Sequence, residues 1–226
     1  MRGEFTRGAR AAVPVSLGIV AYALVFGVLV AGKGIGVGTL AFMNLAVFSG
    51  SAQFVLVGMW QAGLPVWQMA LAAAVVNVRY FLLTAAIAPM MEPYGWFGRA
   101  WRVHFVTDEN WAVTMAENRR AAVGANFLLG GGVLVMAAWS LGTLAGHGLG
   151  ITIRHPERFG MDFAFTAIFT ALAVTMWRGR GDILPWAVSA GTALLARRML
   201  PGAWYVLLGG LAGAMTAALM GKRDSA

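Results

Sequence analysis

Long apolar runs separated by short charged or Gly/Pro-containing segments dominate the sequence. The first run covers residues 11–32 and follows a basic segment, residues 1–10. About 20 apolar residues span a bilayer as a helix, and this run is longer than the apolar region of a signal peptide. The pattern therefore predicts a first transmembrane helix. Since Lys and Arg are retained in cytoplasmic segments, residues 1–10 are expected to form a basic cytoplasmic N-terminal tail.

The next apolar stretch, residues 34–78, contains no charged residue and is long enough for two crossings. We expect these at residues 37–57 and 66–88, joined by a Gly-Leu-Pro turn, with Pro89 and Pro93 ending the second. Later apolar runs predict further spans at 127–149, 163–177, 183–196 and 204–220, followed by a short C-terminal tail, residues 221–226.

The number of spans depends on residues 104–117, a polar segment that is still apolar enough to form a short helix inside a bundle. If it crosses, the chain has eight spans and both termini are cytoplasmic; if not, it has seven. The distribution of Lys and Arg favours eight. The predicted fold is all-α: one polytopic transmembrane transporter domain over residues 1–226, with 7–8 transmembrane helices.

A weak internal repeat accompanies this pattern. Leu64-Pro65-Val66-Trp67 precedes Asn77-Val78-Arg79, and Leu184-Pro185-Trp186 precedes Arg197-Arg198 at nearly the same distance. Phe42 and Phe48 lie upstream of the first motif, and Phe163 and Phe169 lie upstream of the second. Transporters often contain such symmetry. The alternative is that these residue types are simply common at membrane boundaries.

Composition supports the membrane assignment and excludes several classes of protein. Of 226 residues, 59% are apolar and 12% are charged, about half the charged fraction of soluble domains. This excludes a soluble enzyme, a disordered chain and a fibrous protein. The net charge of +8 is spread between the apolar runs, whereas binding of nucleic acid requires clustered basic residues.

Cofactor and enzyme chemistry have no support in the sequence. The chain has no Cys, and its three His residues lack the spacing of metal ligands. No phosphate-binding loop of the Walker type occurs. We therefore expect no metal, no cofactor and no enzymatic activity.

The most informative polar cluster is Phe48-Ser49-Gly50-Ser51-Ala52-Gln53-Phe54, in the middle of the second predicted span. Gly weakens helical pairing and Ser competes for backbone carbonyls. We therefore predict a broken second helix at Ser49 to Ser51, whose free amides face an anion, with Gln53 as a further donor and acceptor. The alternative is ordinary close packing of small residues between helices.

Two further sites carry charge inside the apolar pattern. Arg79 lies within the third predicted span beside Asn77, and such a costly charge should face the bundle interior; the alternative is a side chain that extends to the membrane surface. Asp108 and Glu109 are expected to pair with Arg79, to bind a substrate ammonium or to carry a proton. Alternatively, Thr107 and Asp108 cap an interfacial helix. Asp162 is expected to be an N-cap.

At these residues the sequence resembles a known family. Phe48 to Phe54, Asn77-Val-Arg-Tyr80 and Thr107-Asp-Glu109 are similar, in order and spacing, to motifs of the AzlC/YgaZ-type branched-chain amino acid permeases, or exporters. The resemblance spans most of the chain. It implies a multi-pass protein of the cell inner membrane that works with a small hydrophobic AzlD/YgaH-type membrane subunit. Tyr80 stands where a His often follows the Arg, so no proton role is expected at that position.

The function expected from residues and resemblance together is ion-gradient-driven secondary transport of branched-chain or similar apolar L-amino acids. The expected substrate-binding residues are Ser49, Gly50, Ser51, Gln53, Asn77, Arg79, Asp108 and Glu109. Met43, Phe48 and Phe54 are expected to contact the apolar side chain. The alternatives are a membrane channel and a non-transporting scaffold subunit of a two-component complex.

Overall fold

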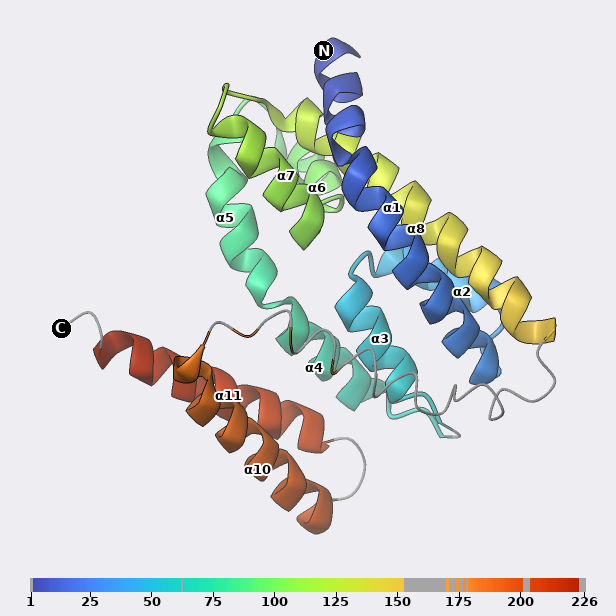
Figure 1. The fold of residues 1–226 in the computed structure, drawn as a ribbon, viewed down its shortest axis with the longest axis vertical. Coiled ribbons are helices and arrows are strands. Elements are labelled where there is room, and N and C mark those ends of the chain that lie inside the picture. Colours follow the sequence, from blue (N-terminus) through green and yellow to red (C-terminus); the bar gives the residue numbers. More distant parts are fainter. Residues whose placement is uncertain are drawn as a thin grey trace. The chain divides into compact units, whose positions relative to one another are not determined.

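The computed structural model describes residues 2–61, 63–152, 170, 174, 177, 179–200 and 204–223. The secondary structure of these residues is helical, without strands, which confirms the all-α prediction. The helices, labelled in Figure 1, are α1 (Arg2–Gly32), α2 (Val37–Ala46), α3 (Gly50–Gly58), α4 (Val66–Asn77), α5 (Arg79–Met91), α6 (Trp96–Val103), α7 (Asp108–Asn118), α8 (Ala125–Thr152), the short 3₁₀ helix η2 (Arg180–Asp182), α10 (Ile183–Met199) and α11 (Trp204–Arg223).

The chain divides into two units, which are described separately. Unit 1 consists of Met1–Gln53 and Asn77–Phe159, and unit 2 consists of Phe54–Val76 and Gly160–Ala226. Unit 1 contains α1, α2, the first residues of α3, and α5 to α8. The single transporter domain expected from the sequence stays a prediction.

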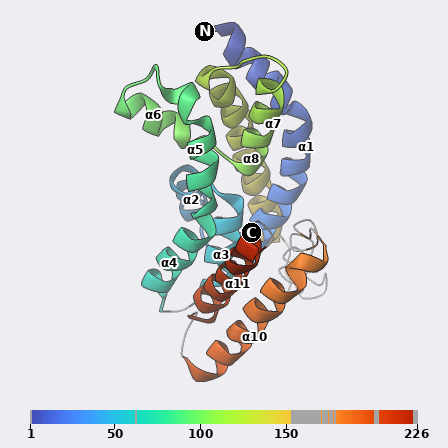
Figure 2. The same ribbon diagram turned by 90° about the vertical axis from the view of Figure 1, so that its left-hand side faces the viewer.

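In unit 1, α1 and α8 run parallel and side by side (Figures 1 and 2). Their backbones approach so closely that glycine is required. A Cβ atom placed on Gly8 would lie 1.9 Å from the carbonyl oxygen of Phe127, and one on Gly146 would lie 2.0 Å from that of Leu24. Small residues that allow such contact are typical of membrane helix pairs, because lipid supplies no hydrophobic drive for association.

The second predicted span is broken, as expected. The first half, α2, ends at Ala46, and α3 begins at Gly50, so the break lies slightly earlier than the expected Ser49 to Ser51. The buried Gln53 amide stabilises it: Nε2 donates to the carbonyl of Val47 at 2.7 Å and to that of Met43 at 3.3 Å. A side chain thus supplies hydrogen bonds at the break in the helix.

The third predicted span forms two helices, α4 and α5, with Val78 between them. This break was not predicted from the sequence, and the helix ends at Met91, between Pro89 and Pro93, the two prolines expected to end it. Pro89 lies in the last turn of α5, which continues to Met91. A proline inside a helix removes one i→i−4 hydrogen bond, and here the helix continues for only two residues beyond it.

Among the described residues, two helices are each long and apolar enough to cross a membrane: α1, from Gly3 onward, and α8. The pair α4 and α5 also qualifies if it forms one broken span. At 11 residues, α7 is about 16 Å long, well short of a hydrocarbon core of about 30 Å. The described residues therefore do not confirm seven or eight spans. The predicted span 163–177 lies outside them, apart from residues 170, 174 and 177.

The N-terminal segment differs from the prediction. Residues 1–10 were expected to form a tail, but α1 already begins at Arg2. Tertiary contacts explain the difference. Arg7 pairs with Glu117 of α7, and Gly8 packs against the backbone of α8, so the basic segment is part of the folded helix pair.

Unit 2 contains most of α4 together with α10 and α11. Helices α10 and α11 pack antiparallel, and a small core forms from Met59, Met69, Ala72 and Leu207. The predicted repeat is not tested by this arrangement. Its basic residues differ in context, since Arg197 lies in the last turn of α10 whereas Arg79 follows a break. The second Phe pair, 163 and 169, lies outside the described residues, as does Asp162.

Candidate functional site

A cavity in unit 1 lies between α1, α5, α7, α8 and the break before α3. Its empty volume, including the open mouth, is about 400 Å³. It combines charged and hydroxyl groups with apolar and aromatic walls. The lining residues are Ile19, Tyr22, Phe48, Gly50, Arg79, Tyr80, Thr107, Asp108, Glu109, Val135 and Trp139.

Arg79 is the cationic centre of the cavity. Its Nη2 atom lies 2.9 Å from Oδ2 of Asp108 and also donates to the hydroxyl of Ser51. The two charged side chains are 36% and 44% exposed, so solvent screens the pair. The buried Nε of Arg79 has no hydrogen-bond partner in the described part of the chain. The Nη2 atom of the guanidinium is therefore occupied, whereas Nε has no acceptor among the described residues.

The helix break contributes two further contacts. Ser49 Oγ donates to Asn77 Oδ1 at 2.8 Å, which ties the break to the residue before the α4–α5 interruption. Gly50 lines the cavity directly opposite the Trp139 ring. A Cβ on Gly50 would lie 3.3 Å from Cη2 of that ring, closer than an ordinary van der Waals contact. Glycine at this position therefore leaves room for the indole ring.

A buried hydrogen-bond network lies behind this wall. The indole N–H of Trp139 donates to Gln53 Oε1 at 3.0 Å and to Asn44 Oδ1 at 3.1 Å, and Asn44 Nδ2 donates to Thr143 at 2.7 Å. Gln53, Asn44 and Thr143 are at most 1% exposed. Buried polar groups that are satisfied in this way specify a unique packing. The network therefore fixes the indole ring against the break between α2 and α3.

The α7 helix begins at the cavity with its own cap. Thr107 Oγ1 accepts from the backbone N–H of Asn110 at 3.2 Å, and Asp108 and Glu109 occupy the first turn. Asn110 is fully buried, and its Nδ2 donates to the carbonyls of Phe105 and Leu128 at 3.0 and 2.9 Å. The capping role that the sequence offered as an alternative is thus present, and so is the pairing of Asp108 with Arg79.

Three helices start at the cavity: α3 at Gly50, α5 at Arg79 and α7 at Asp108. The first amides of a helix have no intrahelical acceptor, and this end carries the positive end of the helix dipole. Starts of interrupted helices facing one cavity make a favourable place for an anionic group. Substrate sites of many transporters are built in this way.

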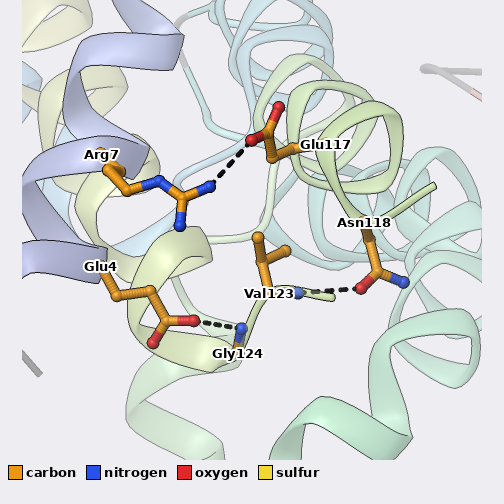
Figure 3. A network of polar contacts seen from close by, with 6 residues as sticks. All are labelled: Glu4, Arg7, Glu117, Asn118, Val123 and Gly124. Carbon is orange, nitrogen blue, oxygen red and sulfur yellow. Dashed lines mark hydrogen bonds and ion pairs between the residues drawn. The ribbon is translucent and has the colours of Figure 1, made fainter. Parts of the chain in front are cut away.

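The far end of α7 is tied to the N-terminal end of α1. Arg7 Nη2 lies 2.9 Å from Glu117 Oε1, and the Glu4 carboxylate accepts from the backbone N–H of Gly124, just before α8 (Figure 3). A carboxylate at a helix start is favourable because of the helix dipole. These contacts place the end of α7 at the same end of unit 1 as the start of α8.

Helix α5 also ends there. Met91 packs with Ala125 and Leu128 of α8 in one buried cluster. Residues 92–120 therefore begin near the start of α8 and reach the cavity at Thr107 and Asp108. Helix α7 then returns the chain to the end of unit 1 where α8 starts. This geometry does not support the crossing expected of residues 104–117 and favours the alternative in which they do not cross.

Most of the predicted site residues come together. Gly50, Arg79, Asp108 and Glu109 line the cavity, Ser51 bonds to Arg79, and Ser49 bonds to Asn77. Gln53 instead stabilises the helix break and Trp139 from behind. Among the expected apolar contacts, Phe48 lines the cavity, whereas Met43 and Phe54 do not.

Sequence reasoning missed Tyr22 and Trp139 as lining residues. Trp139 offered a signal, because it lies in the middle of an uncharged predicted span, whereas membrane Trp residues gather at the interfaces. Tyr22 offered a similar signal in the first span. Which residues these aromatic rings face depends on helix packing and could not be read from the sequence.

The histidines in the described part of the chain have structural surroundings. His147 is buried, and its Nε2 lies 2.8 Å from the carbonyl oxygen of Ile35. His104 packs near the rings of Phe48 and Phe105. Within the described residues, no group of three or more His, Asp or Glu residues is arranged to bind a metal ion. His155 lies outside these residues.

Comparisons with known proteins cover the part of the chain that forms this cavity. A family model described as AzlC protein matches residues 14–153, which include the whole cavity. An uncharacterized membrane protein of Helicobacter pylori strain J99 is 23% identical over 74% of this chain and 72% of its own length. Its counterpart in strain 26695 is 24% identical over 77% of this chain and 78% of its own length.

No solved structure matches the chain. The family model nevertheless covers more than half of the chain, from within α1 to just beyond α8. The chain belongs to the AzlC protein family.

Proposed function

We propose that this chain is the larger subunit of a secondary transporter that moves branched-chain or similar apolar L-amino acids across the cytoplasmic membrane. The observation that carries the proposal is the composition of the cavity. It places one cation and two carboxylates next to apolar and aromatic walls, between membrane-type helices. An apolar amino acid needs the same combination: a partner for its carboxylate, a partner for its ammonium group and an apolar surface for its side chain.

The carboxylate of the substrate would lie at the start of α3, near Gly50, and accept from the guanidinium of Arg79. The ammonium group would face Glu109, which lines the cavity and makes no ion pair within the described ranges. Asp108, already paired with Arg79, holds the guanidinium in place. The side chain would contact Phe48 and Val135, which fits an aliphatic substrate.

The remaining parts of the proposal follow from family membership and composition. Transport would be driven by an ion gradient, since the sequence contains no nucleotide-binding motif, and the chain would act as a permease without enzymatic activity. The working unit would include a small AzlD/YgaH-type membrane subunit. Arg2, Arg7 and Arg10 would keep the N-terminus on the cytoplasmic side of the cell membrane.

The experiment is transport of labelled leucine, isoleucine and valine in proteoliposomes, with and without the small subunit, under imposed proton and sodium gradients. We expect saturable flux with counterflow, and competition by apolar amino acids but not by glutamate or lysine. Flux without saturation or counterflow would indicate a channel. Absence of flux in both preparations, from correctly inserted protein, would indicate a scaffold role and overturn the proposal.

A further inference from the structure

Helix α6 was not predicted from the sequence, and its surface differs from that of the other helices of unit 1. None of its residues is buried, and three aromatic side chains are largely exposed: Trp96 at 74%, Phe97 at 83% and Trp101 at 60%. Figure 2 shows α6 projecting beside α5. Contiguous exposed aromatic surface of this kind marks a contact with another molecule or with a membrane.

The two faces of α6 have different chemistry. At 100° per residue, the three aromatic side chains fall within an arc of about 140°, and Arg99 and Arg102 lie on the opposite side. Both Arg side chains fold back onto the protein. Arg99 donates to the carbonyls of Tyr94 and Glu92 at 2.6 and 3.2 Å, and Arg102 lies 3.5 Å above the Tyr94 ring. On the aromatic face, Trp101 packs edge-on against the ring of Phe105, with 5.1 Å between the ring centroids, whereas Trp96 and Phe97 form its most exposed part.

One contact places α6 beside the first turn of α8. Arg102 Nη2 donates to Asn126 Oδ1 at 3.3 Å, and Asn126 is in the first turn of α8. Because α8 is one of the helices long enough to span the membrane, its first turn marks a membrane boundary. Helix α6 therefore lies at the boundary and not at the depth of the hydrocarbon centre.

We propose that α6 is an interfacial helix that inserts Trp96, Phe97 and Trp101 into the boundary between lipid headgroups and acyl chains. Tryptophan is the residue typical of this layer, and a short helix with aromatic and basic faces is typical of proteins that lie in it. The excess of Arg at this end of unit 1, including Arg119 and Arg120, fits an anionic lipid surface. The anchored helix would hold the segment that carries Asp108 at a constant depth.

The test uses single-cysteine variants of the full chain, which has no native Cys, labelled with a small fluorophore and reconstituted in vesicles of phosphatidylcholine and phosphatidylglycerol. Ala100→Cys, on the aromatic face, changes the helix least, and Phe97→Cys is the second variant. Two reference positions are Leu141→Cys, 69% exposed in the middle of α8, and Arg120→Cys, in the exposed loop after α7. Quenching is measured with nitroxide lipids labelled at shallow and deep positions and with aqueous iodide.

For both α6 variants we expect the shallow nitroxide to quench at least twofold more than the deep one, and iodide to quench at least twofold less than at Arg120→Cys. Leu141→Cys should show the reverse order of depth. Quenching by iodide equal to that at Arg120→Cys would show that α6 lies in water. Protection from every quencher, with or without the small subunit, would show that another protein surface covers the aromatic face. Either result overturns the proposal.

Discussion

Nη2 of Arg79 lies 2.9 Å from Oδ2 of Asp108, and the two residues start two different helices that end together near the beginning of α8. The pair therefore joins the α5 and α7 starts at the cavity. Arg79 also contacts Ser51 of α3, so one guanidinium links the starts of three helices. A change at this position should affect transport more than stability, because the pair is part-exposed and screened ion pairs contribute only about 0–1 kcal/mol.

The first prediction concerns Arg79→Lys. A guanidinium can contact Asp108 and Ser51 through one nitrogen and still present further donors to a carboxylate, whereas an ammonium group has a single nitrogen. We expect the rate of leucine transport in proteoliposomes to fall by about tenfold or more, with normal insertion. Transport at the wild-type rate would remove Arg79 from the site.

The second prediction compares the adjacent carboxylates. Asp108→Asn should cause the larger loss of transport, because it leaves the charge of Arg79 without its partner, whereas Glu109→Gln alters an exposed side chain with no ion pair in the described residues. We expect Glu109→Gln to raise KM more than it lowers the maximal rate, as loss of an ammonium contact should. The measurement is initial flux against leucine concentration for both variants. Equal losses would contradict the separate roles.

The third prediction concerns the contact between Gly50 and the ring of Trp139. A Cβ on Gly50 would already lie 3.3 Å from the indole ring, which the buried network holds in place. Gly50→Ala should therefore reduce transport, and Gly50→Leu should abolish it while the protein still inserts. Gly36→Leu is the matched control, since a Cβ there has no neighbour within 4 Å. Full activity of Gly50→Leu would make this segment ordinary helix packing.

The fourth prediction concerns the contact between α1 and α8. Gly146→Leu should destabilise the protein by about 1–3 kcal/mol or more, because a Cβ would lie 2.0 Å from the carbonyl oxygen of Leu24. Gly148, two positions further along the same helix, has no heavy atom within 4 Å of its Cβ position, so Gly148→Leu should have little effect. Thermal unfolding in detergent compares the two variants. Equal unfolding temperatures would show that the helices do not require this close approach.

The fifth prediction concerns the membrane side of residues 92–120. Since Met91 packs on the start of α8 and Arg120 precedes it closely, single cysteines at Glu92 and Arg120 should react with a membrane-impermeant reagent from the same side. Ile151→Cys, 68% exposed near the end of α8, should react from the other side. Labelling of Glu92→Cys and Arg120→Cys from opposite sides would restore the crossing of residues 104–117 and eight spans.

The sequence by itself determined the features that depend on composition and local pattern. Apolar runs identified α1 and α8, and the Ser-Gly-Ser-x-Gln cluster identified a broken second helix, because glycine and competing hydroxyl groups weaken helical hydrogen bonding. The free-energy cost of placing charged side chains in a membrane made Arg79 and the Asp108-Glu109 pair candidates for one site. Family membership was visible in the same short motifs.

Only the tertiary structure decided which of these residues face one another. Gln53 was expected in the site but lies behind it, and Trp139 became part of the wall, because each depends on how α2, α3 and α8 rotate against each other. Residues 104–117 are compatible with a crossing by composition, yet the contacts of Glu117 with Arg7 return α7 to the end where α8 begins. Hydropathy measures the cost of placing a segment in lipid, but the direction of a short, polar helix is set by its contacts with the long helices around it.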